Sequence, residues 1–298
     1  MRSNSTNVLL IGIAISDMIY LFYYVYDEIR LRQIAKQNLT DECTPPTTWL
    51  ETFASVATMA LRDIFRRVSA WLGFSLALVR CLAIKYAVSG RFSWLTEVST
   101  SWKVIGSVFL MSTFVSSLNF GRLKIYYIKP WVPGETCSQL PMNSSYPIYA
   151  WTENSFFVDY KLLARQLYLF IDGGSRLIPP LVYPIFAVIL ILELKKMKER
   201  RKTGMQTNKK EDNVTSFVVF LTFSYIVTET PMAMLYWIQL WFANTTQLLH
   251  SISNLSIIMS TLLMSACSVH FIMCISISSQ YLATVKQYCR CGKQNVEA

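Results

Sequence analysis

Long apolar runs alternate with short polar connections along the chain, and six of these runs are long enough to cross a membrane. A membrane-spanning α-helix needs about 20 mostly apolar residues. The predicted spans cover residues 7–29, 49–86, 103–124, 165–199, 213–242 and 247–277. A short amphipathic helix on the membrane surface is predicted over 278–288, before a cytosolic tail, 289–298. The pattern predicts an all-α, polytopic membrane helical bundle that forms a single transmembrane domain over 1–298.

The composition agrees with a membrane protein and narrows its partners. Of the 298 residues, 53% are hydrophobic and 15% are charged, whereas soluble domains average about 25% charged residues. The net charge of +10 would suggest nucleic acid in a soluble protein. Here the basic residues fall between apolar runs, which indicates cytosolic loops beside membrane lipids, and no nucleic-acid partner is expected. The sequence holds no metal-ligand spacing and no catalytic motif, so we expect neither an enzyme nor a cofactor.

Two independent patterns orient the predicted spans. A dense basic run starts at Lys195 and Lys196, between the fourth and fifth spans, and the positive-inside rule places it in the cytosol. N-glycosylation sequons at Asn38, Asn143 and Asn244 follow the first, third and fifth spans, which fits an outer face. Short sequons also occur by chance. Together the patterns predict a multi-pass protein of the plasma membrane with a cytosolic C-terminus.

Two cysteines, Cys43 and Cys137, lie in the predicted outer connections. Disulfides persist on this oxidising side of the membrane, so one bridge between them is plausible. The alternative is two cysteines that are free or packed separately.

Several ionisable residues interrupt the predicted spans, and a charge inside a membrane is costly enough to suggest a function. Asp17 must be neutral, paired or bound to a cation. Arg62 and Arg66 stand one turn apart on one helical face, which would suit a ligand with an acidic group or a carbonyl-rich peptide end. The alternative is internal neutralisation by Asp63 and Glu229, which would give these charged residues a structural role only.

Arg80 lies about one turn from the end of the second span, in the stretch WLGFSLALVRCLAIK. An arginine at this depth either extends its side chain to the membrane interface or contacts a cytosolic partner.

The motifs of these spans resemble a known receptor class. The first span, LIGIAISD, carries the L-x-x-x-A-x-x-D pattern of rhodopsin-like receptors at Leu10, Ala14 and Asp17, and the second ends ALVRCLAIK around Arg80. The stretches MRSNSTNVLLIGIAISD and SAWLGFSLALVR, with SSQY near the C-terminus, resemble the nematode class W serpentine receptors. That family is similar to receptors for FMRFamide-like and myosuppressin-like neuropeptides.

The resemblance implies a G-protein-coupled receptor with a seven-helix fold, of which this chain shows the second to seventh helices. Met1 falls where the first intracellular loop is expected, so the first helix is expected to be missing. The receptor would bind a neuropeptide or a small chemosensory molecule and activate a heterotrimeric G protein. The alternatives are a six-span transporter or channel, or a non-signalling receptor fragment.

The resemblance also assigns roles to residues. It implies G-protein coupling by Arg80, Lys85, Lys195 and Lys196; ligand binding between the helices by Arg62, Asp63, Arg66, Glu229 and Tyr236; and a polar core with a candidate sodium site at Asp17, Ser69 and His270.

Several positions depart from the receptor pattern. Val79 and Cys81 flank Arg80 where relatives carry an acid and a tyrosine, so we expect a weaker restraint on the inactive state. Glu229 replaces a tryptophan, and His270 replaces the asparagine of the last helix. A buried Asp17 bonded to Ser69 or Ser268 would need no sodium ion.

Overall fold

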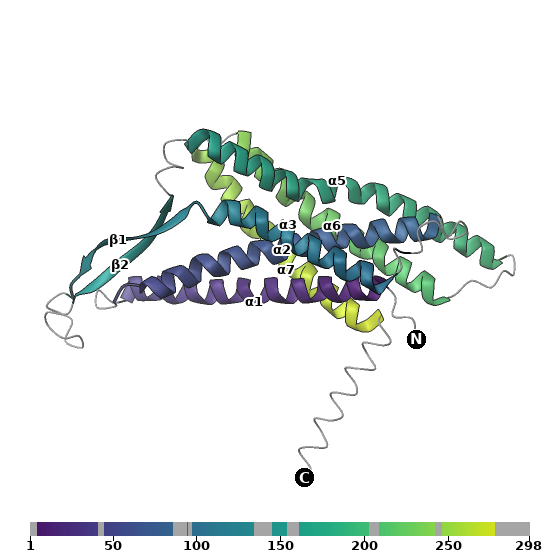
Figure 1. Ribbon diagram of the computed structural model, residues 1–298, viewed down its shortest axis with the longest axis horizontal. Coiled ribbons are helices and arrows are strands. Elements are labelled where there is room, and N and C mark those ends of the chain that lie inside the picture. The colour runs from purple at the N-terminus through teal and green to yellow at the C-terminus, as the bar shows by residue number, and fades with distance from the viewer. Residues whose placement is uncertain are drawn as a thin grey trace, which may run out of the picture.

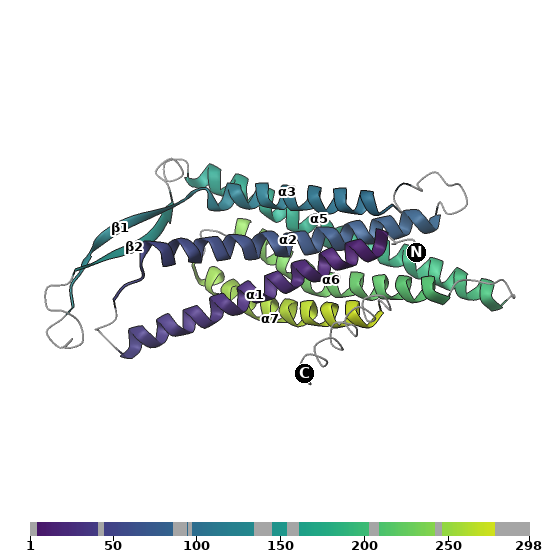
Figure 2. The same ribbon diagram turned by 60° about the horizontal axis from the view of Figure 1, so that its bottom comes forward.

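The computed structural model describes residues 5–40, 45–85, 94, 97–133, 145–153, 161–202, 209–241 and 246–277. Within these ranges the chain forms long helices and one β-hairpin. The elements are α1 (Ser5–Thr40), α2 (Trp49–Lys85), α3 (Val98–Phe120), β1 (Leu123–Trp131), β2 (Tyr146–Glu153), α5 (Lys161–Lys202), α6 (Lys209–Trp241) and α7 (Thr246–Ile277). The helices run lengthwise in an elongated bundle (Figures 1 and 2). The predicted helical membrane bundle is confirmed.

Among the described residues, four helical segments are long and apolar enough to cross a membrane: Ser5–Arg30, Val98–Leu118, Phe170–Glu193 and Val218–Leu235. Large apolar side chains such as Phe22, Leu110 and Phe223 are more than half exposed on the outside of the bundle. A water-soluble protein rarely exposes so many apolar side chains together, whereas lipid accepts them without cost. The bundle is therefore that of a multi-pass membrane protein.

Helix α2 is the central element, because it packs against α1, α3, α5 and α6. The C-terminal half of α2 supplies the fully buried Leu72 and Leu76 to the main apolar core. Close packing there depends on Gly73, since a Cβ at this position would lie 2.5 Å from Cε2 of Tyr225 on α6. The glycine allows the Tyr225 ring to lie directly on the α2 backbone.

The β-hairpin is a feature that the hydropathy pattern did not predict. Strands β1 and β2 pair antiparallel from Leu123 with Glu153 to Trp131 with Tyr146, with an irregularity between Tyr127 and Pro130. Helix α3 ends at Phe120, so the predicted span over 103–124 is too long at its C-terminal end. The hairpin lies at the end of the bundle where α1 ends and α2 begins. Helix α5 ends and α6 begins at the opposite end (Figures 1 and 2).

Candidate functional site

A cavity of about 390 Å³ lies among the helices, in the half of the bundle nearer the hairpin. Its walls combine aromatic and sulfur-containing side chains with charged groups from α2 and α5. The lining residues are Tyr20, Tyr24, Met59, Arg62, Asp63, Arg66, Phe120, Asp172, Arg176, Met232, Leu235, Ser256 and Ser260. Every helix of the described bundle contributes at least one of them, so the cavity is bordered by all six.

We call the ionised residues around this cavity the outer charge cluster: Asp27, Arg62, Asp63, Arg66, Arg67, Asp172, Arg176 and Glu229. Arg62 pairs with Asp27 of α1, with 3.2 Å between Nη1 and Oδ2. The guanidinium of Arg62 also lies 5.5 Å from the centre of the Tyr24 ring, a cation–π distance. This pair is the most exposed of the cluster, because 34% of the Arg62 side chain remains accessible.

A second pair joins α2 to α6. Arg66 donates from Nη2 to Oε2 of Glu229 at 3.1 Å and from Nε to Oε1 at 3.4 Å. The two-pronged geometry suits a guanidinium on a carboxylate, and both side chains are about nine-tenths buried or more. Since Arg66 lines the cavity, this link between α2 and α6 lies within reach of a ligand.

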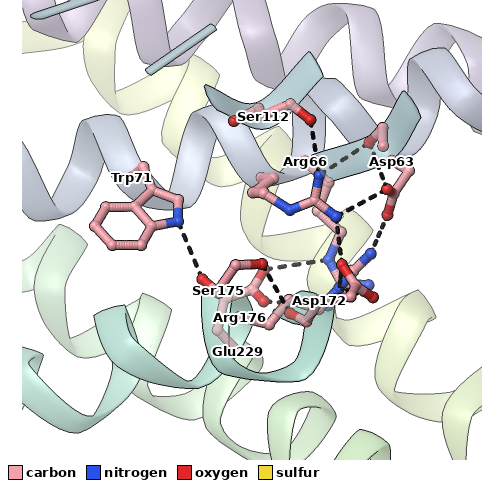
Figure 3. Close-up of polar contacts among 10 residues, drawn as sticks. Asp63, Arg66, Trp71, Ser112, Asp172, Ser175, Arg176 and Glu229 are labelled. Carbon is pink, nitrogen blue, oxygen red and sulfur yellow. Dashed lines mark hydrogen bonds and ion pairs between the residues drawn. The ribbon is translucent and has the colours of Figure 1, made fainter. Parts of the chain in front are cut away.

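The remaining four residues form a closed ring between α2 and α5, which we call the quartet: Asp63, Arg67, Asp172 and Arg176. Arg67 donates to Asp63 Oδ2 at 2.9 Å and also to Asp172. Arg176 donates from Nε to both Asp172 oxygens at 3.1 Å and from Nη2 to Asp63. Figure 3 shows Asp63, Asp172 and Arg176 facing one another between the two helices. Each arginine thus contacts both carboxylates.

Helix α3 completes the surroundings of the quartet. Arg67 donates from Nη1 to the Ser112 carbonyl at 3.0 Å and to Ser116 Oγ at 2.9 Å, and Ser116 donates to Asp63 at 2.8 Å. One turn further along α2, the Trp71 indole donates to the Ser175 carbonyl of α5 at 3.0 Å (Figure 3). These bonds tie α2, α3 and α5 together at the level of the cavity.

The outer charge cluster holds four arginines and four carboxylates, and each arginine contacts at least one carboxylate. The expected cationic wall of Arg62 and Arg66 is therefore balanced, as the internal-neutralisation alternative describes. The partners differ from that expectation in one respect, because Arg62 pairs with Asp27 and not with Asp63. Asp172 and Arg176 were not predicted as site residues, although a carboxylate and an arginine four residues apart in an apolar run indicate an ion pair on one helical face.

A second group, the inner polar cluster, lies deeper among α1, α2, α6 and α7: Asp17, Ser69, Ser224, Tyr225 and His270. Ser69 donates to Asp17 Oδ1 at 2.5 Å and lies 2.8 Å from the Tyr225 hydroxyl. His270 places Nδ1 3.4 Å from Asp17 Oδ2 and bonds Ser224 through Nε2. Asp17 and His270 are each only 1% exposed.

The donor set of this cluster does not fit a sodium ion. Hard cations prefer several oxygen ligands, but the free oxygen of Asp17 faces a ring nitrogen of His270. Ser268, the other expected partner of Asp17, is exposed and donates to the Met264 carbonyl instead. Among the described residues, no group of three or more His, Cys, Asp or Glu side chains is arranged to hold a metal ion.

The expected coupling residues gather at the end of the bundle away from the cavity. Arg80 is half-buried between the buried Val79 and Cys81, and Lys85 is exposed at the end of α2. On α5, Lys195 and Lys196 are exposed, and Lys196 pairs with Glu193 at 3.0 Å. The C-terminal ends of α2 and α5 lie at the same end of the bundle (Figures 1 and 2).

Several expected sites lie outside the described residues: Cys43, Cys137, Asn143, Asn244, the amphipathic segment 278–288 and the tail 289–298. Asn38 and Tyr236 belong to the described backbone of α1 and α6, but their side chains lie outside the description. The predicted disulfide, glycosylation sites and surface helix therefore stay predictions.

Comparison with known proteins gives the family. The sequence model of the serpentine type 7TM GPCR chemoreceptor Srw matches residues 1–292. No curated protein matches the chain. The match covers nearly the whole length and agrees with the resemblance found in the motifs around Asp17 and Arg80. The chain belongs to the class W (Srw) family of serpentine receptors and is a multi-pass membrane protein of the G-protein-coupled receptor type.

Proposed function

We propose that the protein is a plasma-membrane receptor whose ligand binds in the 390 Å³ cavity and shifts the bundle toward a state that activates a heterotrimeric G protein. The observation that carries this proposal is the position of the Arg66–Glu229 pair. It joins α2 to α6, and Arg66 also lines the cavity. A ligand that competes for Arg66 would weaken the hold of α2 on α6 and so favour a rearranged state.

The size and lining of the cavity restrict the ligand. A volume of about 390 Å³ is at the small end of ligand pockets, so it suits a small chemosensory molecule or the terminal residues of a neuropeptide such as an FMRFamide-like peptide. The charges of the wall are balanced, while Tyr20, Tyr24, Met232 and Leu235 supply apolar contact area. A ligand with a polar end and an apolar body matches this lining.

The two ends of the bundle support an orientation for the proposed receptor. The connections that carry the sequons of Asn143 and Asn244 follow the hairpin-side ends of α3 and α6. The basic end of α5, with Lys195 and Lys196, lies at the opposite end. The hairpin end is then extracellular, and Arg80 lies on the cytosolic side, where it would contact the G protein.

A cell-based assay tests the proposal. The full chain is expressed with G-protein activation reporters and screened against amidated peptides and small polar organic molecules. An agonist found this way should lose at least tenfold in potency in Arg66→Gln and Met232→Ala. Met111→Ala, which changes an exposed methionine of α3 that does not line the cavity, is the matched control and should leave potency unchanged.

Three results would count against the proposal. Unchanged agonist potency in both cavity variants would place the ligand elsewhere. A ligand-gated current in cells that lack G proteins would favour a channel. If the protein reaches the cell surface but none of the tested peptides or small molecules activates any G protein through it, the non-signalling alternative is favoured.

A further inference from the structure

Each oxygen of the buried Asp17 carboxyl group faces a polar side chain. Ser69 donates to Oδ1 at 2.5 Å, and Nδ1 of His270 lies 3.4 Å from Oδ2. Tyr225 then closes the cluster, with its hydroxyl 2.8 Å from Ser69 and its ring centre 5.1 Å from that of His270. The cavity that we assign to the ligand is lined by neither Asp17 nor His270.

Hydroxyl groups connect Asp17 to α6. Ser69 donates to Asp17, and the Tyr225 hydroxyl lies 2.8 Å from Ser69 Oγ and donates to the Ser69 carbonyl at 3.3 Å. The single proton of Ser224 goes to the Leu221 carbonyl at 2.8 Å. The oxygen of Ser224 also forms a hydrogen bond with Nε2 of His270.

The imidazole of His270 occupies the space beside the second oxygen of Asp17. Its ring nitrogen Nδ1 and the carboxyl oxygen Oδ2 face each other at 3.4 Å, and both side chains are only 1% exposed. An N–H group at Nδ1 would point toward this oxygen. A buried carboxylate needs a counter-charge or a hydrogen-bond donor, and His270 is the side chain placed to provide one.

We propose that His270 takes the place of the cation at Asp17, so that this receptor has an internal imidazole counter-group where its polar core would otherwise hold a sodium ion. The consequence is a link from α1 through His270 of α7 to Ser224 of α6 that does not depend on dissolved sodium. This inference concerns ion binding and stands whether or not the receptor couples to a G protein.

Thermal unfolding of the purified full chain in lipid nanodiscs tests the proposal, in sodium chloride and in choline chloride of equal ionic strength. The wild-type midpoint should agree between the two salts within about 1 °C. In His270→Asn the carboxylate loses its counter-group. That variant should gain a saturable, sodium-specific rise in midpoint on the order of 2 °C, because an ion that binds only the folded state stabilises it. Asp27→Asn, which alters another buried acid of α1, is the control and should stay insensitive to sodium.

Two results overturn the proposal. One is a saturable, sodium-specific rise in the wild-type midpoint that Asp17→Asn abolishes, since it would show a sodium site at Asp17. The other is an equal loss of midpoint in both salts for His270→Asn, since it would make His270 a packing residue only. If His270→Asn does not fold, the comparison of the wild type with Asp17→Asn decides alone: a sodium-specific rise that Asp17→Asn removes refutes the proposal, and agreement between the two salts supports it.

Discussion

The bundle contains two buried polar regions that are built on different principles. The outer charge cluster uses four arginines and four carboxylates beside a cavity. The inner polar cluster uses one carboxylate, one imidazole and three hydroxyl groups packed against the apolar core. The outer cluster borders the 390 Å³ cavity, whereas no residue of the inner cluster lines it.

This difference separates the roles of the two regions. An ion pair beside a cavity can exchange one partner for a charged or polar group of a ligand, because the ligand replaces the lost contact. A packed cluster offers no such exchange, so it responds only when its helices move. We therefore expect changes in the outer cluster to alter ligand response, and changes in the inner cluster to alter stability and basal activity.

The largest loss of stability is expected for changes in the quartet. Asp172→Asn leaves Arg67 and Arg176 with one carboxylate between them in a buried position. Removing one partner of a buried ion pair costs about 3–5 kcal/mol. The measurements are the yield of folded protein at the cell surface and its thermal unfolding midpoint.

The double variant Asp172→Asn with Arg176→Gln restores the charge balance and should recover part of the loss. If the single variant is as stable as the wild type, the quartet contributes nothing to the fold and the contrast between the clusters fails.

The next effect is expected at the contact between α2 and α6 below the cavity. Gly73→Ala places a methyl group 2.5 Å from the Tyr225 ring, and crowding of a packed core costs about 1–3 kcal/mol. Gly106→Ala is the matched control, because nothing lies within 4 Å of its added Cβ. Gly106→Ala should leave the free energy of unfolding unchanged or raise it by up to about 1 kcal/mol, since alanine favours the helix. Equal unfolding midpoints for the two variants would show that the Tyr225 region is not tightly packed.

The third effect is expected at the link between α2 and α6. Glu229→Gln removes the charge partner of Arg66, and a loosened contact worth about 1 kcal/mol shifts a two-state equilibrium roughly fivefold. We expect basal G-protein activation to rise by that factor, measured per receptor at the cell surface. A basal signal that stays at the wild-type level would mean that the pair does not restrain α6.

How far the sequence predicts this arrangement depends on the kind of feature. The helices follow from apolar runs of about 20 residues, and the family follows from motifs around Asp17 and Arg80. The β-hairpin was missed, although LKIYYIKPW and YPIYAWTE are rich in aromatic and β-branched residues that favour strands. Each segment is much shorter than a membrane span, so the hydropathy pattern does not mark it.

The pairing of charges could not be predicted from the chain alone. Arg62 stands next to Asp63 in the sequence, but successive helical residues point about 100° apart, so they do not face each other. Arg62 pairs with Asp27 of α1, while Asp63 pairs with Arg176 of α5. Which residues meet depends on how the helices are rotated against one another, and a single sequence does not report that rotation.

A smaller effect is expected near the cytosolic end of α2. Val79 stands where relatives have an acid, so Val79→Asp introduces a carboxylate beside Arg80. An added local restraint of the inactive state should lower basal G-protein activation about two- to fivefold, as a change of roughly 0.5–1 kcal/mol predicts. Val79→Asn, similar in size but uncharged, is the control. Basal activation that is the same in wild type and Val79→Asp would refute the expected role of the missing acid.

The smallest effect is expected at Arg62, although it belongs to the same cluster as the quartet. Its side chain is 34% accessible, and pairs with this exposure contribute about 0–1 kcal/mol. Asp27 also keeps a second hydrogen bond, from Thr58 at 3.0 Å, so it is not left unsatisfied when Arg62 is removed. Arg62→Gln should therefore unfold within about 2 °C of the wild type, far above Asp172→Asn. A loss as large as that of Asp172→Asn would show that burial does not rank the pairs of the outer cluster, and that the cluster acts as one unit whose members cannot be changed singly.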